Sequence, residues 1–299
     1  MQPCSIGYAI YTYKEPERIR YLVQHLLGCE TTGAVVVHHD ARSGPLELGL
    51  DDRRLTVLPH PVKVWWAHWS QVEAIVAMLE ELVEVASLRW LVLLTGDDWP
   101  TVPLEDLPDV LDASTADALI EAKNIEEKWG SWEPRLRYGY RWYKLPAVLQ
   151  PLFPTMARVL PKLKGVKFLN RYGKHITVGS LGLRRLRRSA ITLVGGIEYF
   201  IVTPGVASAI IVASKAGSLR RRVLRTFVPT EVFFASAVQQ AGFKTSDPRR
   251  LMRFSPGEAN SDYLTADELR SAAQQGYLFA RKVSLATLRE MAGQGSVQP

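Results

Sequence analysis

Short apolar segments that alternate with helix-like segments constrain the fold of this chain more than any other feature. Residues 5–12 alternate as a strand does, and the run 34–38 is apolar and β-branched like a buried parallel strand. Between them, residues 16–27 form an amphipathic helical pattern, with Pro16 near its first turn and Gly28 just past its end. This order of elements predicts an α/β fold with a mostly parallel central sheet whose two faces are covered.

The same alternation continues through most of the chain. Further strands are expected at 55–58, 90–94, 118–121 and 199–202, and further helices at 70–86, 205–213, 232–241 and 266–275. Thr265, with Glu268 three residues later, makes a capping box for the last of these helices. The segment around 144–190 is less periodic and strongly basic, so we expect a helical or loop-rich insertion there, inside a single domain that spans 1–299.

Composition excludes several classes of protein. With 47% hydrophobic and 22% charged residues, the chain is neither disordered nor collagen-like. Its two cysteines, Cys4 and Cys29, are too few for a disulfide scaffold or a four-thiolate zinc site. The sequence contains no apolar run near the roughly 20 residues that a membrane span needs. We therefore expect a cytoplasmic protein.

Positive charge is concentrated in the second half of the chain. The formal net charge is +7, and Glu198 is the only acidic residue between Glu133 and Glu231. This distribution favours an anionic partner, although a solvated basic face without a specific partner is the alternative. All eight tryptophans lie at or before Trp142, so aromatic and basic residues do not interleave and no nucleic-acid partner is expected. The basic stretch 158–188 is expected to make peripheral contact with the inner membrane face.

Acidic residues follow two of the expected strands. Asp40 comes after the strand at 34–38, and Asp97 and Asp98 come after the strand at 90–94. Ligands of open α/β sheets bind beyond the carboxyl ends of strands, so these carboxylates are candidates to contact a base or a ribose. A carboxylate that caps the next turn is the equally weighted alternative. Adjacent side chains on an extended segment diverge, and we therefore expect no metal site at Asp97–Asp98.

Two glycines and three charged residues are the other candidates for a site. Gly195 and Gly196 precede an apolar strand, where they would let the backbone approach a ligand or would form a simple turn. Glu231 begins a helix and is either a carboxylate stabilised by the helix dipole or, beside arginines, a general base. Arg253 and Lys282 supply cations in the last fifth of the chain, and spacing alone does not bring them to Glu231.

The histidines and tryptophans near residue 65 have a structural and a functional interpretation. No His or Cys spacing suits zinc, which favours a structural role for His38, His39 and His68. Trp65, Trp66 and Trp69 are candidates to stack on a sugar or a base, whereas burial under the following helix is the commoner fate of tryptophan.

Seven segments, taken in chain order, together resemble one known family. They are IGYAIYTYKEP (6–16), VVVHHDAR (35–42), VWWAHWSQV (64–72), LVLLTGDDWP (91–100), GGIEYFIVT (195–203), PTEVFF (229–234) and LFARK (278–282). In this order they resemble the core-2/I-branching β-1,6-N-acetylglucosaminyltransferases and the related peptide O-xylosyltransferases, glycosyltransferase family 14, in a compact bacterial form.

The resemblance implies a GT-A type fold, which is a nucleotide-sugar-binding sandwich. It also implies an inverting, metal-independent glycosyltransferase that moves a sugar, GlcNAc or xylose, from a UDP-sugar to a glycan or other hydroxyl acceptor. No cofactor is implied besides this donor. By the resemblance, Asp40 lies beside the uridine, Glu231 is the general base, and Arg253 and Lys282 bind the diphosphate.

The acceptor region is where the resemblance is least complete. Glu121 and Lys128 fall where the family contacts its acceptor, but the identity of the acceptor does not transfer. Thr230 replaces an aspartate that usually precedes the base, and Glu198 replaces a small or amide residue. Two alternatives stay open: a non-catalytic basic binding protein for acidic glycan, lipid headgroup or nucleic acid on a degenerate transferase fold, and a metal-dependent transferase of another family.

Overall fold

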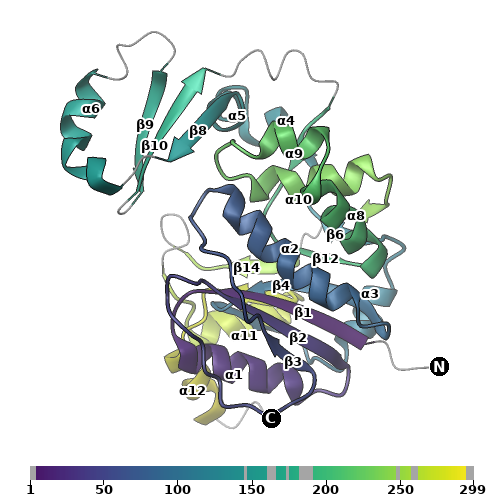
Figure 1. Cartoon of the computed structure of the whole chain (residues 1–299). Coiled ribbons are helices and arrows are strands. Elements are labelled where there is room, and N and C mark those ends of the chain that lie inside the picture. Colours follow the sequence, from purple (N-terminus) through teal and green to yellow (C-terminus); the bar gives the residue numbers. More distant parts are fainter. Residues whose placement is uncertain are drawn as a thin grey trace.

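A seven-stranded sheet forms the centre of the protein (Figure 1). This computed structural model describes residues 5–144, 147–159, 166–172, 175–181, 191–246, 250–256 and 262–293. The strand order is β13-β6-β12-β4-β1-β2-β3. The strands are β1 (Ser5–Thr12), β2 (Thr32–His39), β3 (Leu55–Val57), β4 (Leu88–Thr95), β6 (Ala118–Ile120), β12 (Phe200–Val202) and β13 (Thr245–Ser246).

Most neighbouring strands of this sheet are parallel, as the sequence predicts. β1 pairs in parallel with β2 and β4, β2 with β3, and β13 with β6, whereas β12 is antiparallel to β4 and β6. The parallel pairs direct the carboxyl ends of β1, β2 and β4 to one edge of the sheet. The protein is therefore a mixed α/β structure with a mostly parallel central sheet.

Helices cover both faces of the sheet. Figure 1 shows α2 (Trp69–Val83), α8 (Pro204–Lys215) and α10 (Thr230–Gln240) on one face, and α1 (Pro16–Leu27), α11 (Ala266–Gln274) and α12 (Leu285–Gly293) on the other. Alternate residues of β1 pack into different cores: Ala9 lies in the cluster with α2, and Tyr8 and Ile10 lie in the cluster with α1. Among the described helices, none is both long enough and apolar enough to cross a bilayer.

Local sequence signals explain where these helices begin. Pro16 occupies the first turn of α1, whose buried residues include Ile19, Leu22 and Leu26 at helical spacing. The predicted capping box of α11 is confirmed. Glu268 N donates to Thr265 Oγ1 at 3.2 Å, and Thr265 N donates to Glu268 Oε2 at 2.9 Å.

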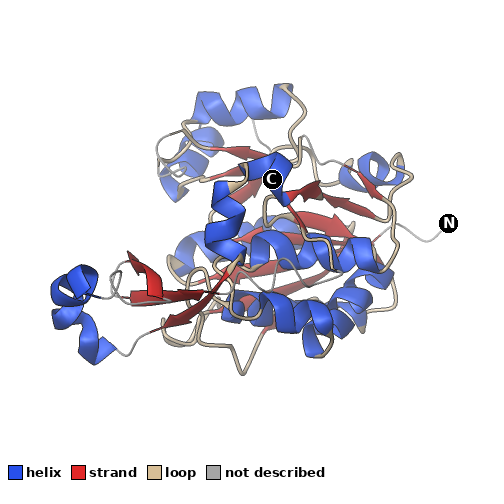
Figure 2. Ribbon diagram, turned by 90° about the horizontal axis from the view of Figure 1, so that it is seen from above, coloured by secondary structure: helices blue, strands red, loops and turns tan. Residues whose placement is uncertain are grey.

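The segment expected as a helical or loop-rich insertion contains strands as well. After α4 (Ile125–Trp129) and α5 (Trp132–Tyr138) the chain forms β8 (Tyr140–Lys144), η1 (Ala147–Leu152), α6 (Phe153–Val159), β9 (Val166–Tyr172) and β10 (His175–Leu181). The strands form an antiparallel sheet in the order β8-β10-β9. We call η1, α6 and this sheet the arm, and Figure 2 shows the arm projecting from the body of the protein.

The description of this insertion as helical or loop-rich was therefore incomplete. Strand pairing within a hairpin satisfies backbone groups without a regular apolar period, so the missing periodicity did not exclude strands. The basic residues at 184–188 lie outside the described residues. The single-domain organisation stays a prediction.

A small three-stranded sheet brings the end of the chain to the carboxyl end of β4. It consists of β14 (Met252–Phe254), β15 (Phe279–Arg281) and β5 (Asp98–Pro100). Arg281 on β15 pairs with Asp98 on β5 across the antiparallel ladder. The segments LLTGDDWP and LFARK, which are far apart in the sequence, therefore lie side by side.

Gly195 and Gly196 allow close approach between parts of the protein itself. Gly195 ends β11 (Val194–Gly195), which pairs with β7 (Lys123–Asn124). Gly196 N donates to the backbone oxygen of Glu231 at 2.9 Å. A Cβ on Gly196 would lie 2.4 Å from both Cβ and the backbone oxygen of Glu121. The glycines thus let these segments meet, a role that neither of the two sequence interpretations included.

We predict that Gly196→Ala destabilises the protein by about 1–3 kcal/mol, because the added methyl group must displace the backbone of Glu121. Gly205→Ala is the matched control, since a Cβ at Gly205 in α8 meets no atom within 4 Å. The control should be neutral or stabilising by up to about 1 kcal/mol. Urea unfolding measures both variants, and equal stability of the two would contradict the steric argument.

Candidate functional site

A cavity of about 830 Å³ opens at the carboxyl ends of β1, β2 and β4. Its wall is built from residues that follow these strands and from three later parts of the chain. The described residues that line it are 11–14, 18, 40, 42, 66, 71, 95–97, 197–199, 228, 231, 254 and 281–282. Ligands of open α/β sheets bind at this edge, so we take this cavity as the candidate site.

Glu231 lies in the first turn of α10 and faces the cavity. Two residues of α5 hold its carboxylate: Arg137 Nη1 donates to Oε2, and Tyr138 Oη donates to the same oxygen at 3.4 Å. Burial raises the pKa of Glu231, the charge of Arg137 opposes this shift, and the charge of Glu198 raises the pKa further. A desolvated carboxylate of this kind takes up a proton more readily than an exposed one.

Glu198 is a second carboxylate in the cavity wall. Burial raises its pKa, the nearby Arg281 opposes the shift, and the charge of Asp98 adds to it. The sequence predicts no role for Glu198, which stands where the core-2/I-branching transferases have a small or amide residue. Its isolation in a long stretch without other acids was the signal that could have identified it.

Arg281 and Lys282 form a cationic part of the wall. Arg281 Nη1 donates to Asp98 Oδ1 at 3.0 Å and also to Thr95 Oγ1. Lys282 forms no ion pair with any residue that the structure describes, which leaves its ammonium group for a ligand. Arg281 was missed in the sequence analysis, although it directly precedes Lys282 in the LFARK segment.

Arg253 is not part of the cavity wall. It lies on β14, and its neighbour Phe254 lines the cavity instead. Successive side chains of a strand point to opposite sides, so the residue next to Phe254 points away from the cavity. Of the two cations predicted for the diphosphate, the structure brings only Lys282 to the same cavity as Glu231.

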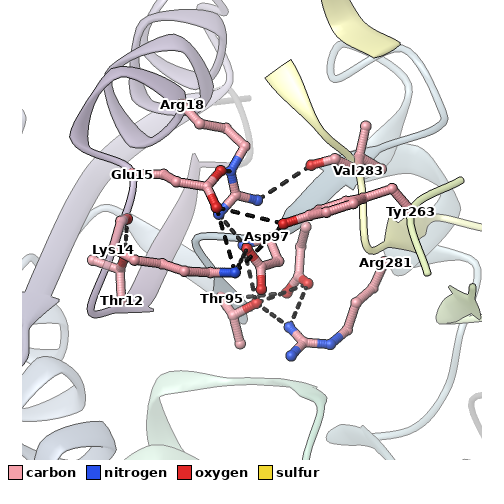
Figure 3. A network of polar contacts seen from close by, with 10 residues as sticks. Thr12, Lys14, Glu15, Arg18, Thr95, Asp97, Tyr263, Arg281 and Val283 are labelled. Atoms are coloured by element: carbon pink, nitrogen blue, oxygen red, sulfur yellow. Dashed lines mark hydrogen bonds and ion pairs between the residues drawn. The ribbon is translucent and has the colours of Figure 1, made fainter. Parts of the chain in front are cut away.

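Asp97 belongs to a network of polar and charged residues in the cavity wall, which Figure 3 shows. Arg18 Nη2 donates to Asp97 Oδ1, and Lys14 Nζ lies 3.6 Å from the same oxygen. Asp98 bonds to other members of this network, Thr95 and Arg281, so the carboxylates of Asp97 and Asp98 have different partners, as the predicted divergence requires. Among the described residues, no group of three or more His, Cys, Asp or Glu side chains could hold a metal ion.

Asp40 is buried at the end of β2 and also lines the cavity. Its Oδ1 accepts from Arg42 N at 3.0 Å and from Val64 N at 3.2 Å, and Arg42 Nε lies 3.0 Å from Oδ2. Burial disfavours the charged form, but the donors from Arg42 and Val64 outweigh it and hold the pKa of Asp40 below its usual value. Asp40 therefore caps a turn, as one of the two interpretations predicts, and it also lines the cavity, where its contact with a base or a ribose stays a prediction.

Glu121 and Lys128 lie together behind the cavity wall. Lys128 Nζ donates to Glu121 Oε2, Lys123 Nζ lies 3.0 Å from Oε1, and Ile197 N donates to Oε2 at 3.0 Å. Burial raises the pKa of Glu121, and the donors outweigh this effect and lower the pKa overall. Because Ile197 itself lines the cavity, the pair predicted to contact the acceptor is one residue removed from it.

The aromatic residues before α2 have different environments. Trp69, the first residue of α2, is buried and packs edge-on against Phe233, whereas Trp66 is 47% exposed and lines the cavity. Trp65 contacts two cations: the Arg42 guanidinium lies 4.3 Å from the ring centre, and Lys144 Nζ also lies over the ring. Trp66 also contacts Phe227 edge to face, with the ring centres 5.5 Å apart.

The histidines of this region serve the fold. His38 Nε2 accepts from Val62 N at 2.8 Å, and burial lowers the pKa of His38. His68 caps α2 by accepting from Ser70 N at 3.2 Å. The structural interpretation of these two histidines is confirmed.

Comparison with known proteins does not identify a family for this chain. No family model matches the chain, and no curated protein matches it. Among solved structures, the crystal structure of 4-diphosphocytidyl-2C-methyl-D-erythritol synthase has 10% sequence identity and a TM-score of 0.34, over 83% of this chain and 89% of that chain. A likeness this distant supports no argument about activity, so the function must be inferred from the residues of the cavity.

The pKa directions of two cavity carboxylates predict opposite effects on stability. The folded-state pKa of Asp40 lies below its unfolded value of about 3.9, so its charge stabilises the fold above about pH 4. Asp40→Asn should cost about 1–2 kcal/mol at pH 7, and this loss should shrink as the pH falls below 4. The pKa of Glu198 is raised, so its ionisation destabilises the fold as the pH rises above about 4.3.

Glu198→Gln should therefore raise the Tm by about 1–4 °C at pH 7 and leave it unchanged near pH 4. Thermal unfolding of both variants across this pH range measures the two effects. If the two substitutions shifted stability in the same direction at pH 7, the assigned pKa directions would be incorrect.

Proposed function

We propose that this chain is a glycosyltransferase with a GT-A type fold that moves a sugar from a UDP-sugar to a hydroxyl group with inversion. One observation carries the proposal: the largely buried Glu231 and Lys282, which forms no ion pair with a described residue, face the same cavity, at the edge of the sheet where nucleotides bind. GlcNAc and xylose are the sugars that the family resemblance favours. The acceptor is a glycan or another alcohol.

Glu231 would act as the general base. An acceptor hydroxyl has a pKa far above 7 and attacks poorly, so a carboxylate must take its proton as the new bond forms. The acceptor oxygen bonds to the anomeric carbon while the bond from that carbon to the diphosphate oxygen breaks, and the electron pair leaves with UDP. Attack from the face opposite UDP gives inversion. Arg137 and Tyr138 would keep the carboxylate oriented.

Lys282 and Arg281 would balance the charge that develops on the departing diphosphate. Fixed cations in a cavity with little water are worth far more than the same cations in bulk water. A divalent ion at Asp97 or Asp98 would have to compete with the arginines that already neutralise these carboxylates. This arrangement supports a metal-independent reaction that needs no cofactor besides the donor.

The other predicted site residues take supporting roles in this proposal. Asp40 would contact the uridine, because it faces the cavity at the end of β2. Glu121 and Lys128 would bind the acceptor only if Ile197 moves aside or the acceptor reaches past it, since Ile197 lies between this pair and the cavity. The exposed Trp66 offers a flat apolar surface to a sugar ring.

We predict that Glu231→Gln lowers turnover by about 10²–10⁴-fold while UDP binding persists, because the amide cannot take the proton. The assay follows hydrolysis of UDP-GlcNAc and UDP-xylose without acceptor, and then transfer of the sugar to hydroxyl groups of glycans and other alcohols. Glu133→Gln is the matched control, since Glu133 also pairs with Arg137 but does not line the cavity. Normal turnover of the Glu231 variant would remove this residue from the mechanism.

We also predict that Lys282→Ala weakens UDP binding by about 10–100-fold, because it removes a cation from the cavity. Arg253→Ala should bind UDP like the wild type, since Arg253 does not line the cavity. Isothermal titration calorimetry in the presence of excess chelator measures both constants. If Arg253→Ala weakened UDP binding and Lys282→Ala did not, the diphosphate would bind on the side of β14 that Arg253 faces. Complete loss of binding on chelation would indicate a metal ion at Asp97–Asp98.

A further inference from the structure

Exposed apolar side chains gather on the arm and on the helix that leads into it. Ten large hydrophobic side chains are exposed in the described part of the chain, and five of them lie between residues 132 and 159. They are Trp132 (69% exposed), Tyr143 (38%), Val148 (78%), Leu152 (52%) and Val159 (50%). Burying such side chains is favourable, so this concentration indicates a surface that is covered in the working protein.

The arm and the segment around it carry positive charge. The sequence contains no acidic residue from 134 to 197, and the exposed side chains of the arm include Arg141 and Arg158. Glu133, at the start of α5, is paired with Arg137. A partner that covers this region must therefore offer negative charge together with an apolar environment.

The shape of the molecule lets the arm reach a flat surface. In Figures 1 and 2 the arm extends from the body, with η1 and α6 at its far end. Val148 and Leu152 on η1 and Val159 on α6 are exposed at that end. A broad surface can contact these side chains without touching the helices around the central sheet.

We propose that the arm docks the protein on a membrane surface that carries anionic lipid headgroups. Val148, Leu152 and Val159 insert at the boundary between headgroups and acyl chains, while Arg141 and Arg158 contact lipid phosphates. Trp132 and Tyr143 have the amphipathic rings that are enriched at this depth of a bilayer. A nucleic acid would satisfy the arginines but would leave the aliphatic side chains in water, so it fits the surface less well.

Vesicle sedimentation with the full chain tests the proposal without any activity assay, so it can fail independently of the proposed function. The probes are vesicles of phosphatidylcholine with phosphatidylglycerol, and vesicles of phosphatidylcholine alone. The wild type should bind the anionic vesicles preferentially and lose binding as the salt concentration rises. The double variant Val148→Asp/Leu152→Asp should bind the anionic vesicles at least about tenfold more weakly than the wild type, since it removes two of the inserted side chains.

Val212→Asp is the matched control, because Val212 is 69% exposed on α8, outside the arm. It should bind vesicles like the wild type, and thermal unfolding should show that all variants fold. Three outcomes would overturn the proposal: equal binding to both kinds of vesicle, wild-type binding by the double variant, or absence of vesicle binding. Binding of a fluorescent oligonucleotide in place of vesicles would assign the basic surface to nucleic acid.

Discussion

The approach of Gly196 to two other backbone segments holds the candidate site together. Its amide donates to the carbonyl of Glu231, and no side chain fits between Gly196 and Glu121. One short segment therefore touches both the start of α10 and the residue that follows β6. Because hydrogen bonds and close packing fix these distances, the carboxylate of Glu231 keeps a defined position relative to the sheet, and Ile197 is directed into the cavity wall.

The carboxylates of the cavity differ in what surrounds them. Asp40 accepts several hydrogen bonds, and these donors outweigh its burial and lower its pKa. Around Glu198 and Glu231 burial prevails over the nearby arginines and raises the pKa. Carboxylates in one cavity thus differ in how readily they take up a proton, because hydrogen-bond donors dominate around Asp40 and burial dominates around Glu198 and Glu231.

The sequence predicts the central elements well because their signals are local. The bounds of β1 and α1 are the predicted ones, and the capping box of α11 lies where Thr265 and Glu268 indicate. The hairpin of the arm was not predicted, since its backbone pairing leaves no regular apolar period in the sequence. Of the candidate site residues, Glu231, Asp40 and Lys282 line the cavity, whereas Arg281 in the wall and Arg137 beside Glu231 were not predicted.

By itself, the sequence determined the alternation of strands and helices, the acidic residues after β2 and β4, and the excess of positive charge, because periodicity and composition are properties of neighbouring residues. Only the tertiary structure decided that Arg281 rather than Arg253 joins Lys282 in the cavity, and that Arg137 is the partner of Glu231. These pairings depend on strand register and on the alternation of side chains across a strand, where a shift of one residue exchanges inside for outside.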